Sequence, residues 1–342
     1  MQAIGRSQLA AIPLALLLLG PALACQRDKA EQPGQPGQPE STAKATKTAQ
    51  SAAASDTKPQ PVENPLLWRI GPEADGEQQP AGYLYGTIHV PDDRVLALPP
   101  AVIGALRTST AVFTEIPMDD ATQMAMAPKL MLSGGRTLND VLPADLYARV
   151  EKKVSASGLP MSMVGRFKIW ALATQLILLD RMMEFATKQP LDKVIRERGR
   201  SAGKRLGALE TVDEQLAVFD ELSEKEQIHL LRQTLDMLVE YEKKGQDPIA
   251  IMLEAYLTGD AAELERVMME TYDPDNPLDR KLIGRLFTKR NRLMAERIRQ
   301  ELTEAKGPVL FAIGAGHLVG DDGLVALLRQ ADLTVERVGA EE

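Results

Sequence analysis

The stretch YLYGTIH at residues 83–89 decides how this chain is expected to fold, and the stretch VLFAIGAGH at residues 309–317 has the same pattern. In each, residues typical of a strand run into a glycine, Gly86 or Gly314, and a histidine follows three positions later. Glycine at that point permits a tight turn and lets another group approach the backbone. We therefore predict that His89 and His317 each lie just past the carboxyl end of a strand.

Outward from these two stretches, the sequence alternates between strand and helix character. Residues 66–70, 111–116 and 333–338 have the composition of strands, and residues 206–209 form a possible one. Helices are predicted at 100–107 and 323–330, and apolar residues recur at helical spacing through much of 119–300. Short strands that alternate with helices indicate an α/β fold. We predict a central sheet built from both chain ends, with a large helical insertion at about residues 120–300.

Imidazole and carboxylate side chains are expected at one edge of this sheet. Glu115 also falls at the end of a strand, and open α/β sheets bind ligands at the carboxyl ends of their strands. His89, His317 and Glu115 could hold a divalent metal ion of the Mn, Co or Zn class. Such an ion lowers the pKa of its bound water and so permits hydrolysis near neutral pH. Glu115 could instead be a general base, and the histidines could simply cap their strands.

Four other polar residues have competing interpretations. Glu210 ends the possible strand at 206–209 and is either a carboxylate of the site or a helix-capping acid. Arg290 and Asn291 lie on a predicted helix, where they could bind a substrate carbonyl or a developing oxyanion. A solvated run of arginines is the simpler interpretation. His229 lies on an amphipathic helix and is expected at or near the surface.

The first 25 residues have the features of a signal peptide. Arg6 precedes an apolar run at residues 9–19, which is too short to span a bilayer. The stretch ends in Cys25, the only cysteine of the chain, directly after an A-x-A site at residues 22–24. Ordinary cleavage at that site and lipid attachment to Cys25 both remain open, and we favour the lipid anchor.

Residues 26–61 are predicted to be a disordered tether between this anchor and the folded part. They are rich in Pro, Gln and Gly and then in Ala, Ser, Thr and Lys, with few large apolar residues to bury. The folded part is then residues 62–342, either one domain with an insertion or two domains.

The overall composition argues against one class of partner. The net charge is −8, acids and bases are mixed along the chain, and 44% of the residues are hydrophobic. No basic stripe is present that could neutralise a row of phosphates. Nucleic acid is therefore not an expected partner.

Several stretches together resemble the TraB/GumN family. PLLW at 65–68 with YLYGTIHV at 83–90 is similar to the opening of that family's domain, and GAGHLVGDDGL at 314–324 is similar to its end. ALET at 208–211, Gln215 and the pair RN at 290–291 match further family positions. The resemblance covers nearly all of residues 64–338.

The resemblance implies both a fold and a chemistry. The family includes the animal Tiki proteins, which are metal-dependent proteases, and it is related to the erythromycin esterase-like and ChaN-like folds. By this resemblance His89, His317 and Glu115 would form a metal-dependent site. The expected function is hydrolysis of peptide bonds in a peptide or protein substrate, with Glu115 and Arg290 as catalytic residues. A protein that binds or sequesters a peptide or small ligand in the same cleft is the alternative.

The sequence also predicts where the protein acts, because a lipid on Cys25 would hold it in the cell envelope, facing the periplasm. Metabolic labelling with a fatty acid is expected to mark the wild-type protein and to leave Cys25→Ala unmarked. Equal labelling of both proteins would contradict the anchor and leave simple secretion to the periplasm.

Overall fold

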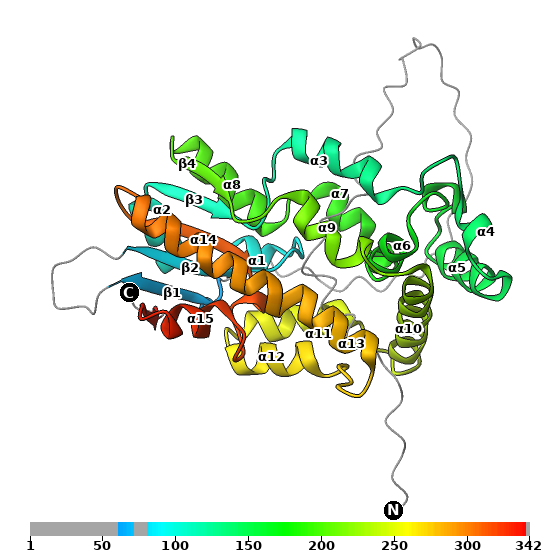
Figure 1. Ribbon diagram of the computed structural model, residues 1–342. Coiled ribbons are helices and arrows are strands. Elements are labelled where there is room, and N and C mark those ends of the chain that lie inside the picture. Colours follow the sequence, from blue (N-terminus) through cyan, green and yellow to red (C-terminus); the bar gives the residue numbers. More distant parts are fainter. Residues whose placement is uncertain (1–60, 72–80, 340–342) are drawn as a thin grey trace, which may run out of the picture.

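The computed structural model describes residues 61–71 and 81–339, and its centre is a six-stranded sheet (Figure 1). The order across the sheet is β4-β3-β5-β2-β1-β6. In chain order the strands are β1 (Leu67–Gly71), β2 (Gly82–Thr87), β3 (Ala111–Thr114), β4 (Arg205–Ala208), β5 (Val309–Gly314) and β6 (Thr334–Arg337). Strands from the two ends of the chain therefore lie side by side, and of these six strands only β4 comes from the long middle part.

The direction of the strands brings four strand ends to one edge of the sheet. β4, β3, β5 and β2 are parallel neighbours, with Thr114 opposite Ala312 and Thr87 opposite Gly314. β1 pairs antiparallel with β2 and with β6. β3 and β5 are buried along their whole length, as expected for parallel strands that helices cover on both faces. Any residue that follows β2, β3, β4 or β5 directly thus lies near the same edge.

Helices cover both faces of the sheet. α8 (Leu191–Ser201) packs on β3 and β4, where a methyl group added to Gly199 would touch Val112. Leu302 of α14 (Arg290–Glu304) lies beside Phe311, whose ring centre is 5.6 Å from that of Phe113. Successive residues of a strand point to opposite faces. α8 and α14 are therefore on opposite faces, and Figure 1 shows α14 crossing in front of the strands.

Most of the chain between β3 and β5 is helical. α1 (Asp93–Leu96) and α2 (Pro100–Thr108) connect β2 to β3. Between β3 and β4 lie α3 (Asp120–Met126), α4 (Leu138–Val141), α5 (Ala144–Ala156), α6 (Ile169–Leu176), α7 (Met182–Thr187) and α8. Between β4 and β5 lie α9 (Val212–Asp220), α10 (Glu224–Lys243), α11 (Pro248–Leu257), α12 (Ala261–Met269), α13 (Pro277–Ile283), a π-helical segment (Gly284–Lys289) and α14. A short 3-10 turn (Ala315–His317) and α15 (Leu324–Gln330) connect β5 to β6.

Local sequence explains where several of these helices begin. Thr211 caps α9 in a capping box with Glu214, and Ser223 caps α10 in the same way with Glu226. Pro248 and Pro277 occupy first-turn positions of α11 and α13, where the missing N–H costs nothing. The helices then pack through their apolar sides.

A pair of buried tyrosines ties this helical part to the sheet. The Tyr256 hydroxyl on α11 donates to the carbonyl of Gly86 at 2.9 Å, and the Tyr85 hydroxyl lies 3.3 Å from that of Tyr256. Since Tyr256 gives its proton to the carbonyl, Tyr85 is the donor to Tyr256. Burial raises the pKa of Tyr85 to about 12, so both hydroxyls keep their protons at neutral pH. A helix of the helical part thereby fixes the stretch from Gly86 to His89, which is called the first motif below.

The predicted fold class is confirmed. Each of the strands and helices expected near the two chain ends is present within a few residues of its predicted bounds. The helical stretch expected at about 120–300 runs from Asp120 to Glu304, but β4 interrupts it. The possible strand at 206–209 is β4, displaced by one residue, and it joins the sheet next to β3.

The signal peptide, Cys25 and nearly all of the predicted tether at 26–61 lie outside the described residues. Within the part that the structure does describe, no helix is both long enough and apolar enough to cross a membrane.

Two glycines, one in crowded and one in open surroundings, test the packing of the sheet. A methyl group at Gly207 on β4 would overlap the buried ring of Phe113, whereas one at Gly104 in α2 would meet nothing within 4 Å. Gly207→Ala is expected to lower the free energy of unfolding by about 1–3 kcal/mol. Gly104→Ala is expected to raise it by about 0.4–1 kcal/mol, because alanine restricts the unfolded chain and suits a helix. Urea denaturation measures both, and equal effects at the two positions would contradict the packing of β4 on β3.

Candidate active site at the sheet edge

Four ionisable side chains follow the four parallel strands. His89 comes after β2, Glu115 after β3, Glu210 after β4, and His317 after β5 in the 3-10 turn. All four are buried, with 8%, 4%, 3% and 0% of their surface exposed. Groups of this kind are rarely so buried unless they are paired, so their partners determine what the site can do.

Glu115 is held by donors from three directions. Its Oε1 accepts from the backbone N–H of Gly314 at 2.7 Å. Its Oε2 accepts from Arg290 Nη2 at 2.8 Å and from Gln215 Nε2 at 3.1 Å. Burial raises the pKa of this carboxyl, and the Arg290 charge only partly offsets that effect. A carboxylate whose pKa is raised is a better proton acceptor than an exposed one.

Arg290 lies between Glu115 and Glu210. Its Nη2 contacts Glu210 Oε2 at 2.6 Å, and its Nε contacts Glu210 Oε1 at 2.8 Å. Although burial lowers the pKa of Arg290, its hydrogen bonds and ion pairs with Glu210 and Glu115 raise it on balance. The π-helical segment directly precedes Arg290, and such segments often occur at functional sites. Arg290 therefore fixes both carboxylates and links α14 to the ends of β3 and β4.

The ring of His317 is fixed through Nδ1. Asn291 Nδ2 donates to the backbone carbonyl of Asp322 at 2.7 Å, which leaves Asn291 Oδ1 to face His317 Nδ1 at 2.6 Å. An amide oxygen only accepts, so Nδ1 carries the proton. Burial, aided by the Arg290 charge, lowers the pKa of His317 well below its usual range, and the ring is neutral at pH 7. Its Nε2 is then unprotonated and carries a lone pair.

That lone pair has no hydrogen-bond partner among the described residues. His317 Nε2 is buried, and it lies 3.8 Å from Glu115 Oε2. A buried polar atom without a partner costs about 1–3 kcal/mol of stability. Such atoms in native structures call for an explanation, for instance a bound ion.

His89 is also fixed through Nδ1, but by a carboxylate. Its Nδ1 lies 2.7 Å from Oδ2 of Asp192, and the hydroxyl of Thr87 donates to Oδ1 of the same carboxylate. Burial alone would raise the pKa of Asp192, but the charge and hydrogen bond of His89 outweigh it and lower the pKa. Asp192 is therefore ionised at neutral pH.

The structure places the predicted residues His89, Glu115, His317 and Arg290 at one edge of the sheet. Glu115, Arg290 and His317 lie in one set of contacts, whereas His89 bonds to Asp192 beside them. The simpler interpretation of Arg290 and Asn291 as solvated residues was wrong, since both are buried. The helix-capping interpretation of Glu210 was also wrong, because Thr211 caps α9 and Glu210 binds Arg290.

Sequence reasoning missed Asp192. It lies in a stretch of α8 where buried residues recur at helical spacing, and that pattern was the available signal. His229 is exposed on α10, as expected, and takes no part in the site.

A divalent metal fits part of this arrangement. Among the residues that the structure describes, no group of three or more His, Cys, Asp or Glu is arranged to hold a metal ion. The two imidazoles nevertheless suit one, because each is oriented through Nδ1 by an acceptor, as metal-binding histidines usually are. The buried lone pair of His317 is the clearest single feature that suits a cation.

Comparison with known proteins decides the family. Residues 66–337 match the TraB/PrgY/gumN family. This chain belongs to that family. The match includes both strand-end histidines, Glu115 and Arg290.

Curated relatives share the same region at low identity. The chain is 26% identical to Metalloprotease TIKI1 of Danio rerio over 326 residues, which cover 82% of this chain and 65% of the relative. It is 27% identical to Metalloprotease TIKI2 of Xenopus tropicalis, covering 83% and 61%, and 26% identical to Metalloprotease TIKI1 of Homo sapiens, covering 85% and 66%. The chain thus spans less than two thirds of the length of these relatives. No solved structure matches it.

The central role of Arg290 can be tested by stability. Arg290→Met leaves two buried carboxylates without their shared cation and is expected to lower the free energy of unfolding by about 3–5 kcal/mol. Arg285→Met is the control, since Arg285 pairs nearby with Glu221, whose side chain is 57% exposed, and such a partly exposed pair is worth about 0–1 kcal/mol. Urea denaturation at pH 7 compares the two, and similar losses would contradict the role given to Arg290.

Proposed function

We propose that this protein is a metal-dependent hydrolase that cleaves peptide bonds. The observation that carries the proposal is the buried, unpartnered Nε2 of His317 beside Glu115, at the carboxyl edge of a parallel sheet. Membership of a family whose curated relatives are named metalloproteases supports the same reaction.

His317 and His89 would hold the metal, and Glu115 is the third candidate ligand. Because Oε2 of Glu115 is bound to Arg290 and Gln215, Glu115 can bind a cation through that oxygen only by sharing or exchanging these partners. Mn, Co and Zn ions all accept imidazole and carboxylate ligands. A bound ion of this class would acidify water and polarise a peptide carbonyl.

The other residues of the site would position and exchange protons. Glu115 would accept a proton from the attacking water, since its burial raises its pKa and so its basicity. Arg290 directs Nε and Nη2 to the two carboxylates, and its Nη1 is engaged only by a long 3.5 Å contact with the carbonyl of Leu286. Nη1 is therefore the part of Arg290 that could stabilise a developing oxyanion.

One observation favours a non-catalytic binding protein as the second candidate. The acidic groups near the histidines are already paired with Arg290, and the described residues include no complete metal-ligand group. A protein of the same fold could use this edge only to bind a peptide or small ligand, since fold does not determine activity.

We further propose that the protein acts in the cell envelope as an exported protein anchored through lipid on Cys25. The apolar run at residues 9–19, which ends near this single cysteine, supports the proposal.

The two candidate functions differ in metal content and turnover. Purified wild-type protein is expected to contain a divalent metal, measured by mass spectrometry of the elements, and to cleave members of a peptide library. A chelator should abolish cleavage and added Mn, Co or Zn should restore it. His317→Ala should lose metal and turnover, whereas His229→Ala should keep both, because His229 is an exposed histidine of another helix. Peptide binding without cleavage or metal, or full activity in His317→Ala, would favour the binding protein.

A further inference from the structure

The two histidines of the site have unequal partners, although their sequence motifs are alike. Asn291, a neutral amide on α14, accepts from His317. Asp192, a carboxylate on α8, contacts His89. The helices that supply these partners cover opposite faces of the sheet. A carboxylate is the stronger acceptor, so the two imidazoles cannot be equivalent as ligands.

Asp192 is itself held in place from several sides. It lies in the first turn of α8, where the helix dipole stabilises a negative charge. The Thr87 hydroxyl donates to Oδ1, while Oδ2 contacts His89. Thr87 and His89 are two residues apart at the end of β2. One buried carboxylate thus fixes both polar side chains of the first motif.

This contact determines which nitrogen of His89 points away from α8. With Nδ1 bonded to Asp192, Nε2 lies on the opposite side of the ring and is the nitrogen that a metal ion would take. A carboxylate on Nδ1 also makes Nε2 more basic and holds the ring in one orientation. Neither effect requires Asp192 to touch the substrate or the metal.

We propose that Asp192 is the positioning residue of His89, which it holds in the Nδ1-protonated form and orients for metal binding. The inference about the metal rests on the proposed function, whereas the inference about the ring does not. Asp192 should therefore affect His89 in the metal-free protein as well as metal affinity.

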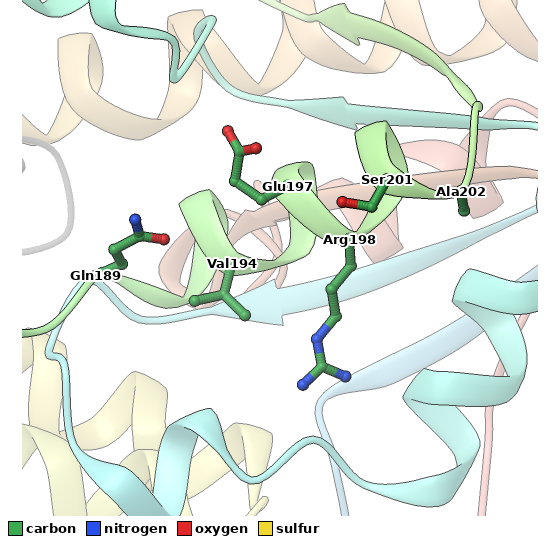
Figure 2. A pocket seen from close by; sticks show the side chains of 6 residues that line it. All are labelled: Gln189, Val194, Glu197, Arg198, Ser201 and Ala202. Atoms are coloured by element: carbon green, nitrogen blue, oxygen red, sulfur yellow. The ribbon is translucent and has the colours of Figure 1, made fainter.

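The outward face of α8 offers a matched control. Residues 194, 197, 198 and 201 of α8, with Gln189 and Ala202, line an open pocket of about 460 Å³. Figure 2 shows this face, with Glu197 among the side chains that α8 presents there. Glu197 pairs with Arg200 three residues later and lies on the opposite side of α8 from Asp192. Glu197→Gln makes the same change from carboxylate to amide without reaching the site.

Nuclear magnetic resonance of the metal-free, full-length protein tests the ring directly. The chain has only three histidines, so ¹⁵N-labelled histidine gives few signals, and a His89→Gln variant assigns those of His89. Nδ1 of His89 is expected to carry a proton in the wild type and in Glu197→Gln. In Asp192→Ala this signal should be lost, while the Nδ1 proton of His317 remains. A His89 spectrum unchanged in Asp192→Ala overturns the proposal.

Cobalt binding, followed by visible absorption, tests the consequence for the metal. Asp192→Asn and Asp192→Ala are expected to weaken Co²⁺ binding by roughly 10- to 100-fold, with the larger loss in alanine, while Glu197→Gln binds as the wild type does. Wild-type Co²⁺ affinity in both Asp192 variants overturns the inference about the metal. Absence of Co²⁺, Zn²⁺ and Mn²⁺ binding in the wild type would overturn the proposed function instead, and the resonance experiment still decides whether Asp192 holds His89.

Discussion

The site depends on one buried cation, the guanidinium of Arg290, which is shared by Glu115 and Glu210. Two carboxylates this deeply buried would repel each other strongly without it. Arg290 is a single positive charge between them, and Asp192 adds a third carboxylate that His89 neutralises only when protonated. Burial and the Arg290 charge keep His317 neutral, so its Nε2 offers a lone pair, and the carboxylates of Glu115 and Glu210 offset the positive charge of Arg290.

The helical insertion is part of the site and not an attachment to the sheet. The strands supply the histidines and Glu115, but Asp192, Gln215, Arg290 and Asn291, which orient them, come from helices between β3 and β5. Tyr256 adds a bond from α11 to the backbone of the first motif. These positioning groups come from helices on both faces of the sheet, and they hold the side chains in fixed orientations, as a preorganised site requires.

The sequence allowed the sheet, its edge and the placement of His89, Glu115 and His317 at that edge to be predicted, because strand periodicity and glycine act locally. The environment of Arg290 could not be predicted in this way. Its burial depends on a π-helical segment that changes the helical phase just before it, and on two carboxylates that are 80 and 175 residues away. Asp192 was missed for a similar reason, since a carboxylate on an amphipathic helix usually faces water and only the fold shows His89 beside it. Glu210 was ambiguous because the residue after it, Thr211, is the better helix cap.

The unpaired lone pair of His317 also bears on the choice between enzyme and binding protein. A strand-capping histidine would direct both nitrogens to backbone or water, and a purely structural position would tolerate an apolar residue that has no unmet hydrogen bond. Here Asn291 fixes the ring so that Nε2 is buried 3.8 Å from Glu115 without a hydrogen-bond partner, which costs about 1–3 kcal/mol of stability. Proteins retain such local costs chiefly at functional sites, where a ligand offsets them. A peptide bound by backbone hydrogen bonds and side-chain pockets would not need this atom, whereas a metal ion would take it as a ligand.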